Sequence, residues 1–561
     1  MGDFFYYFRH YMSKPKTLQL YDSYKKTRIV IDPDNTVKPN TLKIYSCGPT
    51  VYNYQTIGNM RAAWLPDTIT KVAKLAGWQV EWTLNITDVG HLTSDGDEGE
   101  DKIEKGAKRE GKSVQEIIDF YTANYRKQTE ALNLNVPQGF HNPRATQYIK
   151  EQMILALQLL AEKKAYLTND GIYFDTLANI NLEVPNHPVF EIYNHKLHKQ
   201  TSSKNYTGRD ILQTNKKHPD DFALWKFVSE KNLQKWKFNE VEETEELMIR
   251  ILQNLDPKDY DLPNRYGCPG WHSECVCMIC GTLGAKGKPI VNSKFFEQFA
   301  SLPFVIDLHT GGEDHIDVHH KNEILQAEAL GFHLSKNWVH NKFVMVDGRK
   351  MSKSLGNVYL VTGKYEDTGF YSITNPPNQI VEKLQAKYQI SGFDPLSYRL
   401  MLFEHHYTEQ LNFTWEKLEQ SQARLWNLRK EASKLGRVEL INKTEVQKIS
   451  DFDQLLDILT DNLNFPKFLE EYQSLLLDAT KSKDENLINL LIFLEKEILK
   501  LNLFPKIPTQ IQELTNQRIQ AKQQKDFIKA DQIRNQITSL GWQMDDYPWG
   551  WGIWIRNGHQ F

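Results

Sequence analysis

The sequence contains no long apolar run. No stretch of its 561 residues approaches the ~18 consecutive apolar residues of a membrane-spanning helix. The first sixteen residues are rich in aromatics but have neither a continuous apolar core nor a small-residue cleavage site. These absences predict a protein without a membrane role or a secretory signal, and we expect it in the cytoplasm.

The sequence also has no excess of basic over acidic residues, and it contains few cysteines. The formal net charge is −3, which excludes a surface coated with basic residues and leaves only local patches for contact with nucleic acid. There are five cysteines, and four of them lie between Cys268 and Cys280. This clustering favours a metal or catalytic role in a reducing compartment over a disulfide framework.

The order of predicted elements indicates an α/β fold. Residues 42–46 and 80–86 have the alternation or the β-branched content of strands, and residues 61–75 between them have helical spacing. Strand, helix, strand is the opening of a parallel sheet of Rossmann type. A capping box formed by Ser113 and Glu116 predicts a further long helix from Val114.

Composition divides the chain into seven segments. Residues 149–264 mix a helix, short strands and charged loops, the stretch from 357 to 389 is loop-like, and residues 395–503 repeat Leu, Ile and Phe at helical spacing. The predicted segments are an N-terminal extension (1–16), the first half of a Rossmann-type catalytic domain (17–148), an inserted domain (149–264), the second half of the catalytic domain (265–360), an insertion or linker (361–394), an all-α helical bundle (395–505) and a small C-terminal domain (506–561).

The most informative stretch runs from Gly348 to Asn357 and has the sequence GRKMSKSLGN. Lys350 and Lys353 flank a short Met-Ser turn, which suits a mobile loop that holds a triphosphate. Lysine is a flexible point charge, and such cations stabilise the charge that develops as a phosphoryl or nucleotidyl group leaves. Most Lys-Ser loops are simply solvated basic turns, but the full pentapeptide followed by Leu-Gly-Asn resembles the signature of class I aminoacyl-tRNA synthetases.

A second nucleotide signal follows the first predicted strand. Thr56-Ile57-Gly58-Asn59 lies at the start of the predicted helix, where glycine allows close approach of the backbone to a ligand and the helix N-terminus binds anions. Its position matches the His-Ile-Gly-His signature of class I synthetases, with Thr56 and Asn59 in place of the two histidines. The Thr56 hydroxyl can donate to a phosphate oxygen, but it cannot carry the charge of an imidazolium.

A candidate metal site combines residues from three segments. Cys47 ends the first strand, Cys275 follows residues 270–274, and His319 and Glu323 are four apart on a predicted helix and so share a face. Two thiolates, one imidazole and one carboxylate make a tetrahedral Zn²⁺ set, although a helical His and Glu at this spacing are more often a surface pair. The alternative that the spacing leaves open is a structural Cys₄ site formed by Cys268, Cys275, Cys277 and Cys280.

At these positions the chain resembles the cysteinyl-tRNA synthetase family. The similar motifs are residues 47–52 (Cys-Gly-Pro-Thr-Val-Tyr), 269–272 (Pro-Gly-Trp-His), 274–275, 307–312 (Asp-Leu-His-Thr-Gly-Gly), 319–323 and the stretch 348–357, which we call the lysine loop. The resemblance extends over nearly the whole chain apart from the N-terminal extension and the insertions.

The resemblance implies a set of site residues. It implies that one Zn²⁺ is bound by Cys47, Cys275, His319 and Glu323 and meets the substrate thiol directly, with Trp271 and Thr87 beside the substrate cysteine. The implied catalytic residues are Thr56, Asn59, Lys350 and Lys353. The implied contacts of ATP, which enters with Mg²⁺ as a substrate, are Gly48, Thr50, Gly58, His309, Gly311, Gly312, Asp314 and Lys353.

The last segment resembles the anticodon-binding end of bacterial members of this family. The resemblance implies that Asp531 and Asp546 accept hydrogen bonds from anticodon base edges, and whether Arg518 or Lys522 assists them stays open. Single-stranded RNA is also read by stacking on aromatic rings. The aromatic residues available are Trp542, Tyr547, Trp549, Trp551 and Trp554, and packing of the small domain is the favoured role for most of them.

The implied function is ligation of cysteine to tRNA. ATP and L-cysteine give cysteinyl-adenylate, and the cysteinyl group then passes to the 3′ end of tRNA(Cys); we expect the protein to act as a monomer. One alternative is a ligase of the same ancestry that joins cysteine to an amino sugar in mycothiol synthesis, which lacks an anticodon domain. The other is a non-catalytic tRNA-binding paralogue.

Overall fold

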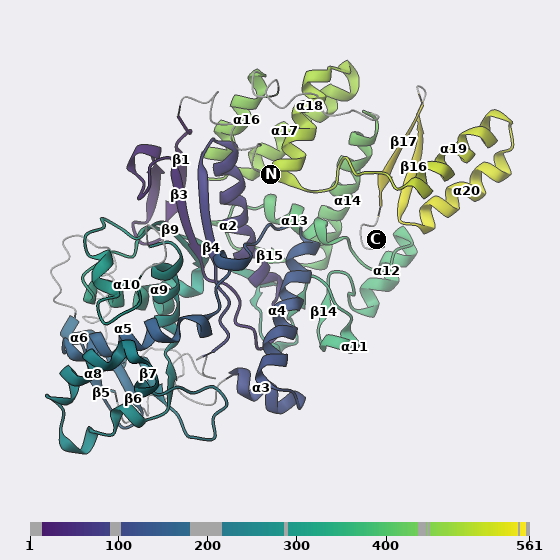
Figure 1. The fold of residues 1–561 in the computed structure, drawn as a ribbon. Helices are drawn as coiled ribbons and strands as arrows, with labels where there is room; N and C mark the ends of the chain where they lie inside the picture. The colour runs from purple at the N-terminus through teal and green to yellow at the C-terminus, as the bar shows by residue number, and fades with distance from the viewer. Residues whose placement is uncertain are drawn as a thin grey trace.

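The computed structural model describes residues 14–89, 102–179, 216–284, 290–435, 446, 449–547 and 550–556. The predicted N-terminal extension therefore lies outside the described residues, apart from its last three positions. Figure 1 shows an α/β body, with the inserted region at its lower left and a small C-terminal domain (yellow) projecting on the opposite side. None of the helices in these ranges is long and apolar enough to cross a membrane.

The centre of the body is a four-stranded sheet whose neighbouring strands are all parallel. Its order is β10-β9-β3-β4, and its strands are β3 (Thr41–Ser46), β4 (Gln79–Leu84), β9 (Ile306–Gly312) and β10 (Ser335–Asn341). Every residue of β3 and β9 is buried, as in parallel strands covered on both faces. The predicted Rossmann-type sheet is confirmed. Ser46 is aligned with Thr310, so β3 and β9 end together at the edge where such sheets bind ligands.

Helix α2 (Ile57–Leu75) connects β3 to β4 and packs on the sheet. It begins four residues before the predicted start at residue 61, because Thr56 caps it and forms a capping box with Asn59. The capping signal is weak in the sequence, since asparagine occupies the place where glutamate or glutamine is usual.

Two helices and two turns follow the first half of the sheet. They are α3 (Lys102–Glu110), α4 (Val114–Ala131) and the 3₁₀ turns Gly139–His141 and Ala145–Tyr148. Ser113 and Glu116 form the predicted capping box at the start of α4, which confirms that prediction.

The inserted region has an antiparallel sheet of its own, in the order β5-β6-β7-β8. Its elements are α5 (Ile149–Ala161), β5 (Ala165–Leu167), β6 (Gly171–Phe174), α6 (Thr176–Asn179), β7 (Phe222–Phe227), α8 (Glu245–Leu252) and β8 (Gly267–Pro269), with 3₁₀ turns at Phe238–Glu240, Glu242–Thr244, Pro257–Asp259 and Leu262–Asn264. Strand β8 pairs with β7, so residues just beyond the predicted boundary at 264 complete this sheet.

The chain returns to the main sheet through helices that carry the site. These elements are α9 (Trp271–Thr282), a 3₁₀ turn at Phe296–Phe299, β9, a second turn at Glu313–His315, a π-helix at Ile316–His320, and α10 (Lys321–Ala329), which leads to β10. Helices α9 and α10 pack against each other. A single π-helical turn is rare and is found frequently at functional sites.

The lysine loop lies in a region of short strands. The elements are β11 (Val344–Val346), β12 (Arg349–Lys350), a 3₁₀ turn at Lys353–Leu355, β13 (Tyr359–Leu360), α11 (Tyr365–Thr368), β14 (Tyr371–Ser372), α12 (Asn378–Tyr388) and β15 (Leu411–Phe413). The prediction of a loop up to residue 389 is wrong over α12. Only Leu384 is fully buried, but Ile380 and Tyr388, one turn before and after it, also pack on the core. The turn signal of Pro376 and Pro377 just before the helix outweighed this helical spacing.

The helical bundle follows as expected from the periodicity. It contains α13 (Pro395–Phe403), α14 (Trp415–Ser433), α16 (Ser450–Thr460), α17 (Phe465–Ser482), α18 (Glu485–Leu494) and a π-helix at Glu495–Leu499. A continuous apolar core joins the bundle to the main sheet and α2. The buried guanidinium of Arg399 donates to the carbonyl oxygens of Leu132, Ile498 and Leu499, which ties the bundle to the end of α4.

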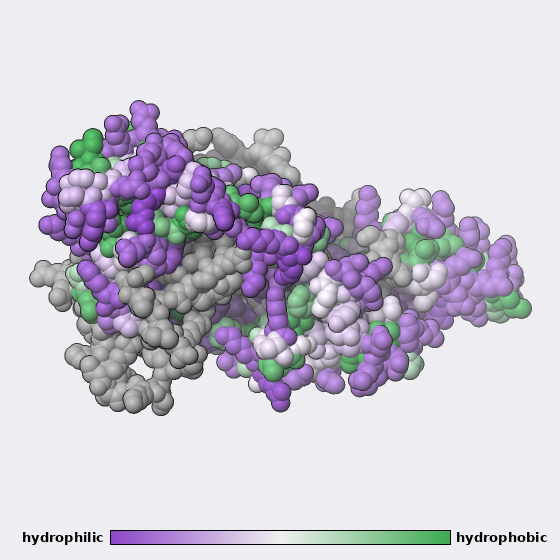
Figure 2. Space-filling view, turned by 90° about the horizontal axis from the view of Figure 1, so that it is seen from below, coloured by the Kyte–Doolittle hydropathy of each residue, from purple (hydrophilic) through white to green (hydrophobic). Residues whose placement is uncertain are grey.

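The chain also forms a β-hairpin near each of its ends. Near the N-terminus, β1 (Leu18–Asp22) pairs with β2 (Thr27–Ile31), and a 3₁₀ turn at Pro33–Asn35 leads into the main sheet. At the other end, helices α19 (Thr509–Gln523) and α20 (Phe527–Ser539) pack together, and the aromatic tail forms the β-hairpin of β16 (Trp542–Tyr547) and β17 (Gly550–Ile555). Seen from below, this C-terminal domain extends as an arm whose visible face is mostly hydrophilic (Figure 2).

The aromatic tail packs its own domain at two positions. Trp542 and Trp554 are 1% and 7% exposed, whereas Trp551 is 38% exposed. Of these three, only Trp551 therefore has much free surface for a partner. Trp549 lies outside the described residues.

Candidate active site and metal centre

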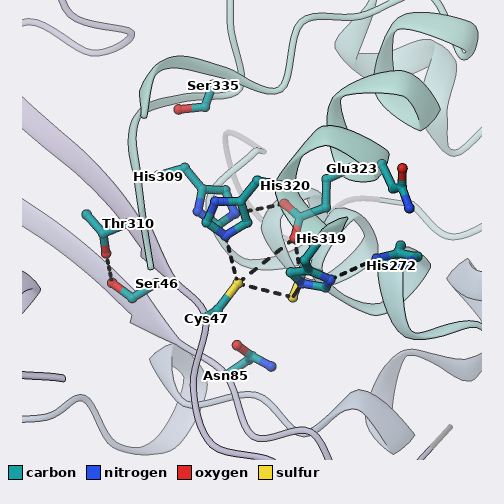
Figure 3. A network of polar contacts seen from close by, with 12 residues as sticks. Ser46, Cys47, Asn85, His272, His309, Thr310, His319, His320, Glu323 and Ser335 are labelled. Atoms are coloured by element: carbon teal, nitrogen blue, oxygen red, sulfur yellow. Dashed lines mark hydrogen bonds and ion pairs between the residues drawn. The ribbon is translucent and has the colours of Figure 1, made fainter. Parts of the chain in front are cut away.

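Four side chains converge at the carboxyl end of β3. Cys47 directly follows that strand, Cys275 lies on α9, His319 lies in the π-helix and Glu323 lies on α10. Their ligand atoms all lie within 4.8 Å of one another. Figure 3 shows Cys47, His319 and Glu323 pointing toward one another from these separate elements. The fold thus brings together all four residues that the sequence analysis proposed as metal ligands.

The distances among these atoms suit a tetrahedral ion. The two sulfur atoms are 3.9 Å apart, close to the roughly 3.8 Å that two Zn–S bonds of ~2.3 Å span at a tetrahedral angle. His319 Nε2 lies 3.4 Å from Cys275 Sγ and 2.8 Å from Glu323 Oε1. A soft thiol pair with one imidazole and one carboxylate is a zinc-type donor set, so the cluster can hold a metal ion and fits zinc.

Charges within the cluster stabilise one another. Burial opposes ionisation of Cys275, but the contacts with Cys47 and His319 outweigh it and lower the pKa of Cys275 to about 6. Burial also opposes charging of His319, yet Glu323 and Cys275 raise its pKa to about 10. Burial would raise the pKa of Glu323, but His309 and His319 hold that pKa well below its usual range. A thiolate and a carboxylate are therefore favoured, whereas His319 is favoured as the imidazolium and must lose its proton before it can bind a metal ion.

The alternative Cys₄ site is not formed. Within the described residues, the groups of three or more donors that could hold an ion include none of Cys268, Cys277 and Cys280. Cys275 and Cys277 are two positions apart on α9, so they point to different sides of that helix. Burial raises the pKa of Cys277 and Cys280 well above the ordinary value, as expected of thiols that pack as small apolar groups.

Of the two residues assigned to the substrate cysteine, Trp271 contacts this cluster and Thr87 pairs with the turn that follows Cys47. The ring of Trp271 stacks on His319 with centroids 4.3 Å apart and planes inclined by 21°. Thr87 is buried, and its hydroxyl accepts a hydrogen bond from Asn85 Nδ2 at 3.2 Å. Cys47 and Trp271 are partly exposed, so the cluster can be reached from solvent.

Two glycines of the site, Gly48 and Gly311, pack closely against neighbouring groups. A Cβ at Gly48 would lie 1.7 Å from the carbonyl oxygen of Asn85, so only glycine fits there. Thr50 forms an isolated bridge with Thr87, which fixes this turn against the end of β4. A Cβ at Gly311 would lie 2.8 Å from atoms of His315 and His320, so a side chain there would displace the histidine cluster.

Three more residues assigned to ATP lie at the end of β9. A Cβ at Gly312 would lie 2.5 Å from Oδ1 of Asp314, whose side chain is exposed. His309 is fully buried, stacks on Trp338 at 4.6 Å and lies 2.8 Å from Glu323 through Nε2. The structure thus groups His309 with the metal donors.

Thr56 and Asn59 bind each other at the start of α2. The backbone N–H and the hydroxyl of Thr56 each lie 2.8 Å from Asn59 Oδ1 and donate to it. A Cβ at Gly58 would come within 2.7 Å of the Met351 side chain. The lysine loop therefore lies against the helix N-terminus, where an anion is favoured.

The two lysines of the loop are exposed and differ in surroundings. Lys350 Nζ lies 4.5 Å from the centroid of the Phe343 ring. Lys353 lines a cavity of about 330 Å³ together with Arg109, Lys112 and Phe370. Desolvation by the cavity wall and the charge of Arg109 lower the pKa of Lys353.

Asn357 is a loop residue that the sequence analysis did not single out. Its side chain accepts from Ser352 N–H at 2.8 Å and donates to the carbonyl oxygen of Lys350 at 3.2 Å. Asn357 therefore fixes the turn that carries both lysines, and the Leu-Gly-Asn end of the motif was its only signal in the sequence.

The histidines around the cluster were also missed as a group. His272 Nδ1 lies 2.9 Å from His319 Nδ1, and His320 Nδ1 lies 2.7 Å from His340 Nε2. Burial lowers the pKa of His272, His320 and His340 well below the ordinary value, so these rings are neutral. The signals in the sequence were His272 at the end of the Pro-Gly-Trp-His motif and the His319-His320 doublet.

The two aspartates assigned to the anticodon have different surroundings. The Asp546 carboxylate accepts hydrogen bonds from Nη1 and Nη2 of Arg518, at 2.8 and 2.7 Å, and lies 3.0 Å from Lys522 Nζ. Both basic residues that the sequence left as alternatives therefore contact it, and Arg518 first, then Lys522, hold its pKa well below its usual range. Asp531 is exposed on α20.

Comparisons with known proteins show which family the chain resembles over most of its length. The family model described as tRNA synthetases class I (C) catalytic domain matches residues 33–239 and 251–368. Cysteine–tRNA ligase 1 of Burkholderia lata is 32% identical, covering 95% of this chain and 96% of that protein. Cysteine–tRNA ligases of Treponema denticola and Thermus thermophilus are 30% and 29% identical; they align over 90% and 94% of this chain, and over 93% and 97% of their own lengths.

Proposed function

The chain belongs to the cysteine–tRNA ligase family of class I aminoacyl-tRNA synthetases, and from that premise we propose how its own residues perform the reaction. L-cysteine and ATP, which enters with Mg²⁺, form cysteinyl-adenylate at the carboxyl edge of the parallel sheet. The cysteinyl group then passes to the 3′ end of tRNA(Cys). We further propose that the protein acts as a monomer in the cytoplasm, where reduced thiols such as its five free cysteines persist.

The observation that carries this proposal is the donor cluster beneath Trp271. Cys47, Cys275, His319 and Glu323 would hold one Zn²⁺. Bound there, zinc ionises a thiol and forms a strong bond to sulfur, whereas a serine hydroxyl is a harder and far less acidic ligand. An apolar pocket separates near-isosteres by only ~10–200-fold, so donor softness supplies the discrimination against serine. Trp271 and Thr87 orient the substrate over the cluster.

The remaining residues handle ATP and its charge. Gly48 and Gly58 let the backbone approach the nucleotide, and the N-terminus of α2 faces the phosphates. Thr56 and Asn59 present a hydroxyl and an amide there, while Thr50, Gly311, Gly312 and Asp314 line the neighbouring strand ends. Lys350 and Lys353 supply positive charge as pyrophosphate leaves, which stabilises the transition state. His309 would act at the boundary between the nucleotide and the metal cluster.

Cysteine-dependent exchange of pyrophosphate into ATP tests this assignment. We expect exchange with cysteine to exceed that with serine by more than the ~10–200-fold available to an apolar pocket, because the donor cluster recognises sulfur. Added tRNA(Cys) should then be charged. A non-catalytic paralogue would show no exchange, and an amino-sugar ligase would show exchange without charging of tRNA.

Metal analysis tests the donor set itself. We expect Cys275→Ala and His319→Ala each to weaken zinc binding by more than about 100-fold, and His272→Ala by about 10–100-fold, the range found for groups that orient a ligand. Zinc content is measured after equilibration at fixed free zinc. Cys280→Ala on the same helix is the matched control and should keep full zinc. Full occupancy in the first two variants would show that the ion lies elsewhere.

A further inference from the structure

A second set of donors surrounds two of the proposed zinc ligands. Within the described residues, two groups of four side chains could hold an ion, and both contain Cys47 and Glu323. The first group adds Cys275 and His319, and the second adds His309 and His320. Figure 3 shows the imidazoles of His309 and His320 on one side of Cys47 and Glu323 and the imidazole of His319 on the other side.

The shared ligands can serve either side. Glu323 directs Oε1 to His319 Nε2 and Oε2 to His309 Nε2, at 2.8 Å in both cases. Cys47 Sγ lies 3.9 Å from Cys275 Sγ and 3.2 Å from His320 Nε2. The carboxylate therefore has one oxygen for each group, and the one sulfur lies between them.

The second group has buried lone pairs that face a common space. His309, His320 and Glu323 are each 0% exposed. Although His309 Nε2 and Glu323 Oε2 are close, neither atom makes a well-aligned hydrogen bond. The two atoms form an ion pair at 2.8 Å, and a cation bound to both would take the place of that contact.

Each group also has an imidazole held by another histidine. His272 contacts His319 through Nδ1, which leaves His319 Nε2 for the first group. His340 contacts His320 through Nδ1 in the same way, which leaves His320 Nε2 for the second group. A hydrogen bond at the far ring nitrogen is the usual device that fixes a metal-binding histidine, and the fold supplies it on both sides.

We propose that Cys47, His309, His320 and Glu323 form a second, alternative position for a divalent transition-metal ion. The two positions exclude each other, because they share Cys47 and Glu323. The inference rests on the proposed function, which assigns zinc to the first group. One thiol, two imidazoles and one carboxylate make this second set harder than the first, and it suits Zn²⁺, Co²⁺ and Ni²⁺. Occupation of the second position leaves Cys275 and His319 uncoordinated.

Cobalt substitution of the full-length protein tests the proposal, because thiolate-to-Co²⁺ charge-transfer absorption reports the number of sulfur ligands. The wild-type protein should bind one Co²⁺ with two thiolates. Cys275→Ala should still bind one Co²⁺, more weakly, and the charge-transfer intensity should fall to about half since one of two thiolates remains. His320→Ala alone should keep the two-thiolate spectrum.

Paired variants separate the second position from a general loss of structure. Cys275→Ala combined with His320→Ala should lose Co²⁺, whereas Cys275→Ala combined with His333→Ala should retain it. His333 is the matched control, because its ring is partly exposed and pairs with Glu328 outside the cluster. Thermal unfolding of the metal-free proteins confirms that each variant is folded.

The outcomes distinguish failure of this inference from failure of the proposed zinc site. A two-thiolate wild type together with a folded Cys275→Ala that binds no Co²⁺ overturns the second position alone. Two Co²⁺ per wild-type chain overturns mutual exclusion. A wild type that binds no Co²⁺ removes the first group and the second with it.

Discussion

Replacing Lys353 with alanine is expected to slow formation of cysteinyl-adenylate by roughly 30- to 1000-fold. This range corresponds to about 2–4 kcal/mol, the typical cost of removing one preorganised charged contact from a transition state. We expect this large effect on the rate because the loop that carries Lys353 lies against the N-terminus of α2, as the approach of Met351 to Gly58 shows. Its charge therefore meets the phosphates where the helix already favours an anion.

The same substitution should change kcat far more than the KM for cysteine. The amino acid binds at the donor cluster, and the lysine acts when pyrophosphate leaves, so ground-state binding of cysteine does not depend on it. Pyrophosphate exchange at saturating cysteine and ATP measures the effect. Lys387→Ala is the control, since Lys387 is an exposed residue of α12 paired with Glu419. An unchanged exchange rate in Lys353→Ala would rule out the role assigned to this residue.

Much of the fold could be predicted because its elements carry local signals. The strands at 41–46 and 79–84 are marked by β-branched and aromatic residues, and the start of α4 is marked by the Ser113 capping box. Helix α12 was missed although Ile380, Leu384 and Tyr388 recur at helical spacing, because the Pro376-Pro377 turn signal directly before it dominates the segment. The earlier start of α2 depends on an unusual asparagine in the capping box.

Prediction of the site residues depended less on local sequence patterns than on the family resemblance. Spacing alone could not choose between Cys275 as a partner of Cys47 and a Cys₄ site within residues 268–280. The choice is made by the fold, which brings the end of β3 against α9 and α10. The sequence assigned His309 only to ATP and gave His320 no role, since β9 and the π-helix must fold before their rings face Glu323. Only the β-hairpin of the tail brings Asp546 to Arg518 and Lys522.

Removal of the chain after Pro505 is expected to leave cysteine activation nearly intact while largely abolishing charging of tRNA. Activation uses the parallel sheet, the donor cluster and the lysine loop, all of which lie before residue 363. The C-terminal domain is docked on α14, where Trp426 Nε1 donates to the carbonyl oxygen of Arg556 at 2.6 Å and Arg429 donates to that of Ile555 at 3.2 Å. Arg429 keeps its contacts with Asp394 and Leu501 after truncation, so the bundle should stay folded.

A point substitution locates the loss within the removed domain. We propose that Asp531 and Asp546 accept hydrogen bonds from anticodon bases, and one lost base contact costs about 1–3 kcal/mol. Asp531→Asn should therefore lower kcat/KM for tRNA(Cys) by about 5- to 150-fold, with pyrophosphate exchange unchanged. Asp531 is the better target, because removing Asp546 would leave the nearly buried Arg518 without its carboxylate. The control is Asp478→Asn, an exposed residue of α17 in the bundle. Equal charging by the truncated and full-length proteins would show that the C-terminal domain does not recognise the anticodon.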